Sequence, residues 1–313
     1  PLKMKILITA PYFQPVPLKY SDILNQHHIE FDMFEVEEKC FESDLIPIIH
    51  KYDGVIAGDD HFTSAVFEKA IKLKVISKWG TGIDSIDLKS AKKHGVKVLN
   101  TADAFIRPVA ETVFGYILSF ARNIHIQNTL MKKGKWEKVE SISLSESSLG
   151  VIGLGSIGKE VIRFGKAFGM ELYGYDIREI STEYIKETGT KMVSKDTLLS
   201  NSDFVSLHCV LNKTTKYIIG AEDFNLMKSN AVLINTARGP LINELDLIKA
   251  INSKTIFGAG LDVFEKEPLD HQHPLRSMDN VLLTPHNSNS APGVREYVHE
   301  NTVNNLLTGL GII

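Results

Sequence analysis

An alternation of short apolar runs with helical segments is the feature that most restricts how this chain can fold. The runs lack a clean apolar-polar alternation, which is typical of strands buried on both faces of a parallel sheet. Helical stretches with an apolar stripe, such as 159–168, lie between them. The sequence therefore predicts an α/β fold with parallel sheets. The predicted strands are Lys5–Thr9, Phe31–Phe34, Gly54–Ala57, Val75–Ser77, Val96–Leu99, Leu149–Gly153, Glu171–Tyr175, Phe204–Leu207, Ala231–Asn235, Gly258–Asp262 and Val281–Leu283.

The number of predicted strands indicates two domains. These strands are too many for one ordinary doubly wound sheet, and 313 residues exceed one ordinary core. A long helix predicted at 108–122 leaves the first strand group, and a last helix is predicted at 293–307. We expect that last helix to return to the first domain and close it. The chain is then two Rossmann-like doubly wound domains, one formed by 1–103 plus 290–313 and the other by 104–289.

Composition excludes several classes of protein. A formal net charge of −3 gives no basic excess for a nucleic-acid partner. No apolar run approaches the roughly eighteen residues that span a bilayer, and the N-terminus lacks a signal-peptide pattern. Two distant cysteines suit a reducing cytosol better than a disulfide framework. We expect a soluble cytoplasmic protein without a metal site, because its histidine pairs lack metal-ligand spacing. These residues are Cys40 and Cys209, and His27, His28, His271 and His273.

A glycine-rich turn marks a candidate dinucleotide site. Gly153, Gly155 and Gly158 form G-x-G-x-x-G between a predicted strand and a predicted helix, with Ser156 and Ile157 inside the turn. The first glycine permits the tight turn, the second lets a diphosphate approach the backbone, and the third lets the helix pack closely. The helix N-terminus then offers N–H groups and a partial positive charge to the diphosphate.

The next strand ends in Asp176, whose carboxylate can accept hydrogen bonds from the adenosine ribose. The same carboxylate repels a 2′-phosphate, which favours NAD over NADP. Arg178 weakens that preference if it faces the cofactor, although a solvated surface arginine is the simpler interpretation. The turn also begins like a triphosphate-binding P-loop, but Glu160 stands where that motif needs Ser or Thr for Mg²⁺.

Three later residues add chemistry to this nucleotide site. Arg238, Glu267 and His286 each follow a predicted parallel strand, at the sheet edge where ligands bind. A guanidinium can clamp a carboxylate or 2-oxo oxygen, and an imidazole can accept the hydroxyl proton as hydride leaves. A carboxylate can orient the imidazole and raise its pKa. Taken singly, each residue also fits a structural role in a turn, a solvated loop or a strand end.

The motifs in this order resemble the D-isomer-specific 2-hydroxyacid dehydrogenase family. The matching segments span nearly the whole chain. They are Lys78–Asp87, Asn100–Ala102, Val109–Thr112, Gly153–Gly158, Asn235–Gly239, Asp262–Pro268 and Thr284–His286. The resemblance implies an NAD-dependent oxidoreductase that transfers a hydride at C2 of a D-2-hydroxy or 2-oxo acid. The physiological acid stays open between 3-phosphoglycerate, hydroxypyruvate and glyoxylate.

The resemblance also implies roles for individual residues. Arg238 would clamp the substrate, His286 would be the acid/base, and Glu267 rather than Glu265 would be its partner. Backbone N–H groups at Gly80, Thr81 and Gly82 would bind the substrate carboxylate. Thr236, Ala237 and Asp262 would line the cofactor cleft. The family commonly dimerises through the cofactor domain, so we expect a homodimer.

Two features depart from the phosphoglycerate dehydrogenases of that family. Asp59 and Asp60 replace an Arg-Ser pair, and we expect them to repel a phosphate if their side chains face the substrate. The chain ends at Ile313, so we expect no regulatory domain. The alternative function is a non-catalytic NAD(H)-sensing protein of the same fold, related to the family's corepressors; the intact Arg238, Glu267 and His286 argue against it.

Overall fold

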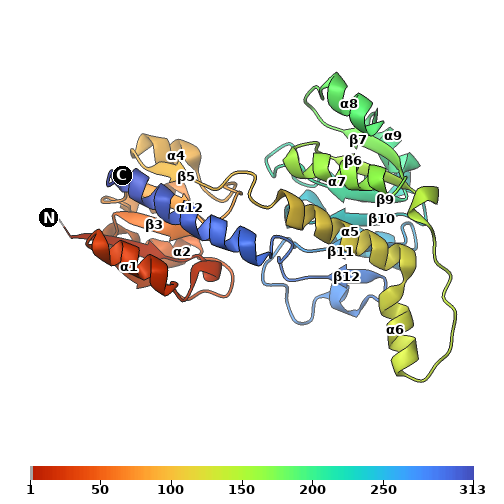
Figure 1. The fold of residues 1–313 in the computed structure, drawn as a ribbon, viewed down its shortest axis with the longest axis horizontal. Helices are drawn as coiled ribbons and strands as arrows, with labels where there is room; N and C mark the ends of the chain where they lie inside the picture. Colours follow the sequence, from red (N-terminus) through yellow and green to blue (C-terminus); the bar gives the residue numbers. More distant parts are fainter. Residues whose placement is uncertain (1–2) are drawn as a thin grey trace. The chain divides into compact units, whose positions relative to one another are not determined.

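The computed structural model describes residues 3–313, which form two compact units (Figure 1). Unit 1 consists of Pro1–Ala104 and Ser290–Ile313, and unit 2 consists of Phe105–Asn289. Pro1 and Leu2 belong to the predicted first domain but lie outside the described residues. The first division lies one residue from the predicted domain limit, and the second coincides with it.

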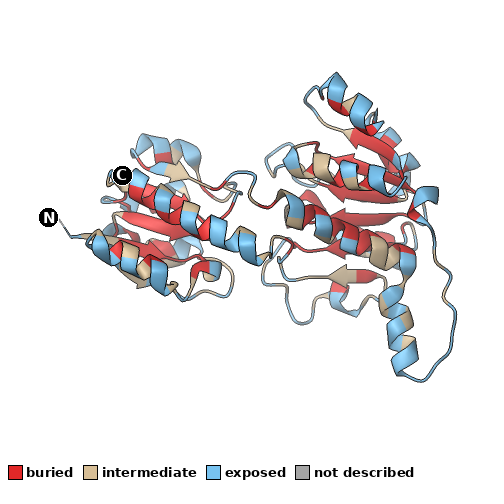
Figure 2. Cartoon of the chain, viewed as in Figure 1, coloured by how far each residue is buried: buried red, intermediate tan, exposed pale blue. Residues whose placement is uncertain are grey.

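Unit 1 contains a five-stranded parallel sheet in the order β2-β1-β3-β4-β5. Its central strand β3 and the neighbouring β4 are buried along their whole length, because helices cover both faces (Figure 2). The strands are β1 (Met4–Ile8), β2 (Ile29–Met33), β3 (Gly54–Ala57), β4 (Val75–Lys78) and β5 (Lys97–Leu99). The helices are α1 (Leu18–Gln26), α2 (Glu42–Leu45), α3 (Ser64–Lys69), α4 (Leu88–Lys93) and α12 (Pro292–Leu310).

The last helix, α12, packs on the unit 1 sheet although about 190 residues separate it from β5 in the chain. The Ser77 hydroxyl donates a hydrogen bond of 2.7 Å to the Thr302 carbonyl. The Trp79 indole N–H donates to His299 Nδ1 at 2.8 Å. Buried Leu306 lies against Gly54 of β3. The helix thereby completes the core of unit 1.

Unit 2 contains a seven-stranded parallel sheet in the order β12-β11-β10-β9-β6-β7-β8. The strands are β6 (Ser148–Ile152), β7 (Glu171–Tyr175), β8 (Lys191–Met192), β9 (Phe204–Leu207), β10 (Val232–Asn235), β11 (Gly258–Leu261) and β12 (Val281–Leu283). The predicted α/β fold with two doubly wound sheets is confirmed. The sequence did not indicate β8, because a two-residue edge strand has no apolar pattern of its own.

Both helices of unit 2 that the apolar pattern predicted begin earlier than expected. The long helix α5 starts at Ile106 rather than 108, because proline is tolerated in a first helical turn. Its other helices are α6 (Ile124–Lys132), α7 (Ser156–Ala167), α8 (Thr182–Thr188), α9 (Lys195–Asn201), α10 (Ala221–Leu226) and α11 (Glu244–Asn252). No helix in residues 3–313 combines the length and the apolar character needed to cross a membrane.

Strand order decides where a ligand can bind in unit 2. The chain runs outward from β6 through β7 to β8, then returns and runs in the opposite direction from β9 to β12. The loops that follow β6 and β9 therefore diverge and leave a crevice at the carboxyl edge of the sheet. All of the predicted cofactor and catalytic residues of unit 2 lie in loops or helix starts at this edge.

Candidate active site

The glycine turn between β6 and α7 is so crowded that two of its positions admit only glycine. Gly153 has φ +94°, and a Cβ there would lie 2.5 Å from the Cys209 backbone nitrogen. A Cβ on Gly158 would lie 2.0 Å from the Gly153 carbonyl oxygen. Since both contacts are with backbone atoms, neither can be relieved by a side-chain rotation. The turn and the first turn of α7 are thus held in one close-packed arrangement.

The opposite side of the turn is open. Gly155 is the residue before α7, and no side chain caps the N–H groups of the first helical turn. A Cβ on Gly155 would meet only the Arg178 guanidinium, at 3.9 Å. Across the crevice, the buried hydroxyl of Thr236 has no hydrogen-bond partner among the described residues. Free N–H groups, open space and an unpaired buried hydroxyl fit a bound dinucleotide.

Asp176 follows the last residue of β7 and is tied to the same turn. Its Oδ2 accepts a 2.7 Å hydrogen bond from the Leu154 N–H. Burial by itself would raise the pKa of Asp176, but hydrogen bonds from Arg178 and Leu154 hold that pKa below its ordinary value. The carboxylate is therefore ionised at neutral pH and carries its charge at the adenosine end of the proposed site.

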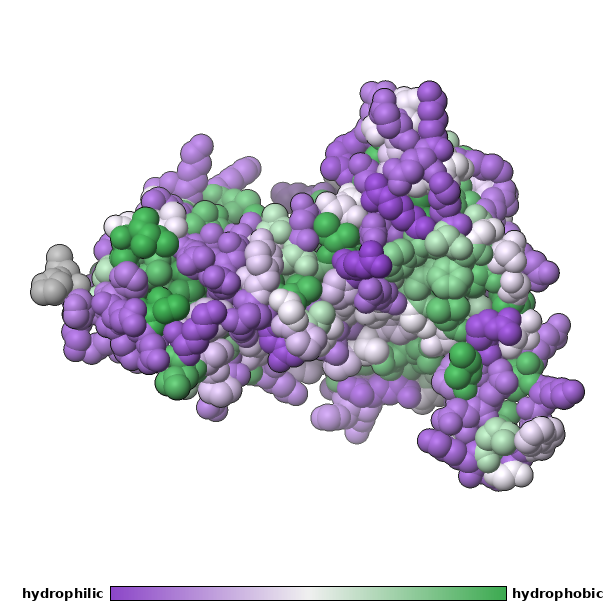
Figure 3. All heavy atoms as spheres, in the orientation of Figure 1, coloured by the Kyte–Doolittle hydropathy of each residue, from purple (hydrophilic) through white to green (hydrophobic). Residues whose placement is uncertain are grey.

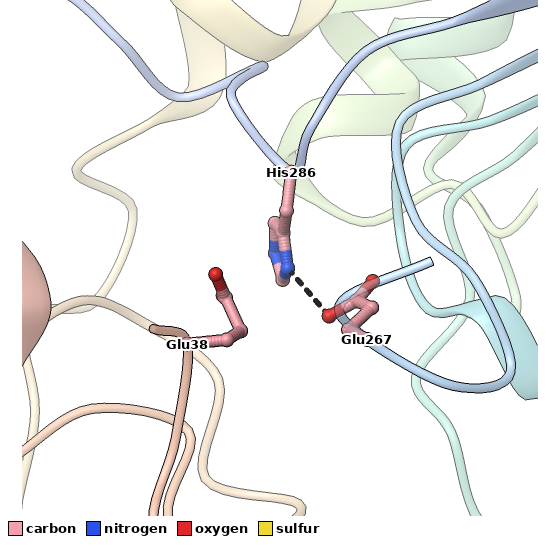
Figure 4. Close-up of side chains that lie close together, drawn as sticks. All are labelled: Glu38, Glu267 and His286. Carbon is pink, nitrogen blue, oxygen red and sulfur yellow. Dashed lines mark hydrogen bonds and ion pairs between the residues drawn. The ribbon is translucent and has the colours of Figure 1, made fainter. Parts of the chain in front are cut away.

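His286 and Glu267 form a direct pair. Figure 4 shows the imidazole edge of His286 turned toward Glu267, with Nδ1 3.0 Å from Oε2. The other carboxylate oxygen of Glu267 accepts a 2.9 Å bond from the Phe264 N–H, which fixes the carboxylate plane. Both side chains are largely buried, at 19% and 12% exposed. Glu265 points elsewhere, because its carboxylate accepts bonds from the Glu244 N–H and the Tyr217 hydroxyl.

The backbone at His286 is held in an unusual conformation. Its φ of +47° is in the left-handed region, which costs a non-glycine residue free energy. Fully buried Asp262 holds the loop in place. Its carboxylate accepts hydrogen bonds from the Thr284 hydroxyl at 2.5 Å, the Asn287 N–H at 2.8 Å and the Ser288 N–H at 2.9 Å. Asp262 thus orders the residues on either side of His286, while its contact with a cofactor stays a prediction.

Sequence reasoning missed two members of this network. The Thr284 hydroxyl also bonds to the Tyr116 hydroxyl of α5. Thr284 belongs to the quoted Thr-Pro-His motif, so its proximity to the site was available as a signal. Nothing in the sequence connects Tyr116 with residues 168 positions later; only the packing of α5 brings it there.

Arg238 follows β10 in a loop that presses against the loop of Glu267. A Cβ on Gly239 would lie 1.9 Å from the Phe264 carbonyl carbon, so the two backbones touch at this point. The loop is also fixed from within, because the Asn235 amide donates to the Arg238 carbonyl at 2.8 Å. The Arg238 guanidinium donates to the Ala237 carbonyl at 2.8 Å. Arg238, Glu267 and His286 are therefore all set on tightly held loops of unit 2.

The predicted substrate loop lies in unit 1, after β4. Gly80 has φ +112°, which favours glycine, and its carbonyl accepts a 2.9 Å bond from the Thr101 N–H. The Thr81 hydroxyl donates to the Thr101 carbonyl at 2.8 Å. Within residues 3–313 the backbone N–H groups of Thr81 and Gly82 donate no hydrogen bond. These two donors remain available to an anion.

The expected repulsion of a phosphate depends on exposed carboxylates at Asp59 and Asp60, and Asp60 does not meet this condition. That carboxylate is fully buried, and burial raises its pKa. It accepts hydrogen bonds from the Thr9 hydroxyl, the Cys40 N–H and the Gly58 N–H, so it holds loops together. Asp59 lies 3.1 Å from the buried Lys78 ammonium, which balances its charge.

Comparisons with known proteins identify the family of this chain. Residues 114–288 match the family model of the D-isomer specific 2-hydroxyacid dehydrogenase, NAD binding domain. A D-3-phosphoglycerate dehydrogenase of Methanocaldococcus jannaschii is 38% identical over 288 residues, which is 90% of this chain and 53% of the relative. The chain thus spans about half the length of that relative. A hydroxypyruvate reductase of Thermotoga maritima is 38% identical over 284 residues, covering 89% of this chain and 92% of the relative.

A solved structure is similar over almost the whole chain. The D-lactate dehydrogenase of Aquifex aeolicus, complexed with NAD and lactic acid, aligns with a TM-score of 0.86 at 28% identity. The alignment covers 98% of this chain and 96% of that chain. The family model covers more than half of the sequence, and close relatives cover nine-tenths of it. The chain therefore belongs to the D-isomer specific 2-hydroxyacid dehydrogenase family.

Proposed function

We propose that this protein is an NAD-dependent dehydrogenase that interconverts a 2-oxo acid and the corresponding D-2-hydroxy acid. The observation that carries the proposal is the pair of His286 and Glu267, whose Nδ1 and Oε2 lie 3.0 Å apart, in the unit that also carries the glycine turn. NADH, when bound, supplies the hydride that this chemistry needs. The protein's own residues then have to bind the acid, orient it and move one proton.

His286 is the proton donor and acceptor in this proposal. Glu267 faces Nδ1 and, as a carboxylate, keeps a proton on that nitrogen. The other ring nitrogen, Nε2, is therefore the atom that gives its proton to the C2 oxygen during reduction and takes it back during oxidation. Glu267 stabilises the positively charged imidazolium by its negative charge, and its own position is fixed by the Phe264 N–H.

Arg238 and the unit 1 loop supply the anion-binding groups. The planar guanidinium of Arg238 can bind a carboxylate and a 2-oxo oxygen with parallel hydrogen bonds. We assign the free N–H groups of Thr81 and Gly82 to the substrate carboxylate.

We further propose that the acid is small and carries no phosphate. Hydroxypyruvate and glyoxylate reductases are among the relatives that this chain covers along most of their length. The loop after β3 supports this assignment, because it carries the acidic Asp59, and Asp59 lies 3.1 Å from the Lys78 ammonium and balances its charge. The competing substrate pair is 3-phosphoglycerate and its 2-oxo form, phosphohydroxypyruvate, and rates with phosphorylated and unphosphorylated 2-oxo acids distinguish the two assignments.

The test is a spectrophotometric panel at 340 nm with glyoxylate, hydroxypyruvate, pyruvate, phosphohydroxypyruvate and longer 2-oxo acids. We expect turnover with NADH, highest for the small unphosphorylated acids. His286→Ala should lose at least about 1,000-fold in kcat, within the range of general acid-base catalysis, and should still bind NADH. Unchanged turnover in that variant would refute the role of His286. NADH binding without turnover of any acid by the wild type would support the sensing alternative.

We also propose a homodimer formed through unit 2. Apolar side chains are exposed on α6 and on the segment after it, where Ile124 is 65%, Met131 52% and Trp136 83% exposed. Figure 3 shows such side chains among polar ones over this region. Exposed apolar groups gathered on one projecting element are typical of a subunit contact. Light scattering should give twice the chain mass, and Trp136→Glu with Met131→Glu should reduce it to the monomer.

A further inference from the structure

Asp176 is engaged by four hydrogen-bond donors. Its Oδ1 accepts from the Arg178 backbone N–H at 2.8 Å and from Arg178 Nε at 3.2 Å. Its Oδ2 accepts from the Leu154 N–H at 2.7 Å and from Arg178 Nη2 at 3.2 Å. A carboxylate offers about four lone-pair positions, so this one is saturated. Two of the four donors belong to the Arg178 side chain.

This set of hydrogen bonds leaves no free acceptor position on Asp176 for the ribose hydroxyls that it is proposed to bind. To accept hydrogen bonds from the adenosine ribose hydroxyls of NAD, the carboxylate must release the guanidinium of Arg178. The two backbone donors cannot leave, because they are part of the turn and of the residues after β7. The Arg178 side chain can leave, since it is 66% exposed while the Asp176 side chain is 5% exposed.

The position of the Arg178 guanidinium also allows it to bind an anion at the glycine turn. Arg178 Nη2 lies 3.9 Å from the Cβ position of Gly155, over the open side of the phosphate-binding turn. A guanidinium there can meet a phosphate on the ribose 2′-oxygen with charge-assisted hydrogen bonds. It also cancels the charge of Asp176, which would otherwise repel that phosphate.

We propose that Arg178 determines cofactor selectivity, so that the site accepts NADP(H) alongside NAD(H). The proposal rests on the proposed function, because it assigns the adenosine end of the same cofactor site. With NAD(H), the guanidinium swings into solvent and Asp176 binds the ribose hydroxyls. With NADP(H), the guanidinium stays at the turn and binds the 2′-phosphate. Selectivity for NAD is weaker than Asp176 alone would produce.

The test compares Arg178→Ala with the matched control Arg163→Ala. Arg163 is another exposed arginine of unit 2 that pairs with a carboxylate, Glu187, through Nε at 2.8 Å. Dissociation constants for NADH and NADPH are measured by nicotinamide fluorescence. Those for 5′-AMP and adenosine 2′,5′-bisphosphate are measured by calorimetry, which needs no turnover. We expect Arg178→Ala to weaken the binding of NADPH and of the bisphosphate at least about tenfold, as expected for the loss of a charge-assisted hydrogen bond.

The same variant should bind NADH and 5′-AMP equally or up to about fivefold more tightly, because an exposed ion pair no longer competes. Arg163→Ala should change neither the ratio of the NADH and NADPH dissociation constants nor that of the 5′-AMP and bisphosphate dissociation constants. A wild type that binds NADH but not millimolar NADPH would overturn the inference, as would an unchanged NADH-to-NADPH ratio in Arg178→Ala. Failure of the wild type to bind either nucleotide would instead overturn the proposed function and this inference with it.

Discussion

Gly239→Ala should abolish most of the activity although it removes no functional group. The glycine lies between Arg238 and the loop that carries Glu267, and it touches neither substrate nor cofactor in our proposal. The Cβ of an alanine would lie 1.9 Å from the Phe264 carbonyl carbon, 2.0 Å from its oxygen and 2.5 Å from the Glu265 nitrogen. All three atoms belong to the backbone, so one loop must move away from the other.

The size of that movement follows from ordinary contact distances. Restoring a contact of 3.4 Å from 1.9 Å separates the two loops by about 1.5 Å. A misplacement of about 1 Å in a catalytic group costs on the order of 100-fold in rate. Inserting a methyl group into a packed region costs about 1–3 kcal/mol of the free energy of unfolding. We therefore expect kcat/KM to fall about 100-fold and the protein to remain folded.

Steady-state kinetics with the best 2-oxo acid and urea unfolding measure the two effects, with Gly115→Ala as the control. Gly115 is exposed within α5, and no atom lies within 4 Å of its Cβ position. That control should keep full activity and gain up to about 1 kcal/mol of stability, because alanine favours helix. Activity within about threefold of the wild type in Gly239→Ala would refute the argument from loop contact.

Three further changes probe other parts of the molecule. Thr284→Val removes the hydroxyl that donates a hydrogen bond to buried Asp262. We expect it to lower the free energy of unfolding by about 1–3 kcal/mol and to lower kcat. Tyr116→Phe is the comparison variant in both measurements. Leu306→Ala should lower the free energy of unfolding of unit 1 by about 2–5 kcal/mol, because it removes buried apolar side-chain atoms. The fluorescence of buried Trp79 reports this unfolding, and the affinity for NADH should stay unchanged. Asp203→Asn should destabilise unit 2 at pH 7 by about 1–3 kcal/mol.

The Asp203 effect has a defined pH dependence. Burial by itself raises the pKa of Asp203, but hydrogen bonds from Ser148 and Lys228 lower it below its ordinary value of 3.8. A depressed pKa in the folded state stabilises the fold fully above 3.8, and the stabilisation is lost as the pH falls through the folded-state pKa. The difference between wild type and Asp203→Asn should therefore shrink in urea unfolding below pH 4 and stay constant between about pH 5 and 7. A difference independent of pH would contradict this account.

Much of the fold was predictable because its signals are local. Buried parallel strands need apolar runs, and eleven of the twelve strands had one of sufficient length. The exception, β8, contains two residues at the sheet edge and gains its conformation from pairing with β7. Helix starts were placed two or three residues late at α5 and α7, because their first turns contain a proline and glycine-turn residues rather than apolar ones.

The loop after β3, which contains Asp59 and Asp60, shows that residue type alone does not predict whether a carboxylate is exposed. Asp59 and Asp60 are adjacent and chemically identical in the sequence. In the structure one is paired with Lys78, while the other is fully buried with three donors around it. Burial depends on which loops pack above a residue, and that arrangement is formed by segments up to 51 positions away.

The sequence by itself determined the α/β class and predicted the dinucleotide turn and the three side chains Arg238, Glu267 and His286, because motif spacing and apolar periodicity are properties of neighbouring residues. The family resemblance already named Glu267 rather than Glu265 as the partner of His286, and the structure adds the 3.0 Å contact between them. Only the tertiary structure decided that Asp262 holds the loop of His286 and that the Arg178 side chain hydrogen-bonds to Asp176. The contacts of Asp262 and Glu267 with the His286 loop depend on the distance between loops that follow different strands, β11 and β12. Such distances arise from strand order and from close backbone contacts such as that at Gly239.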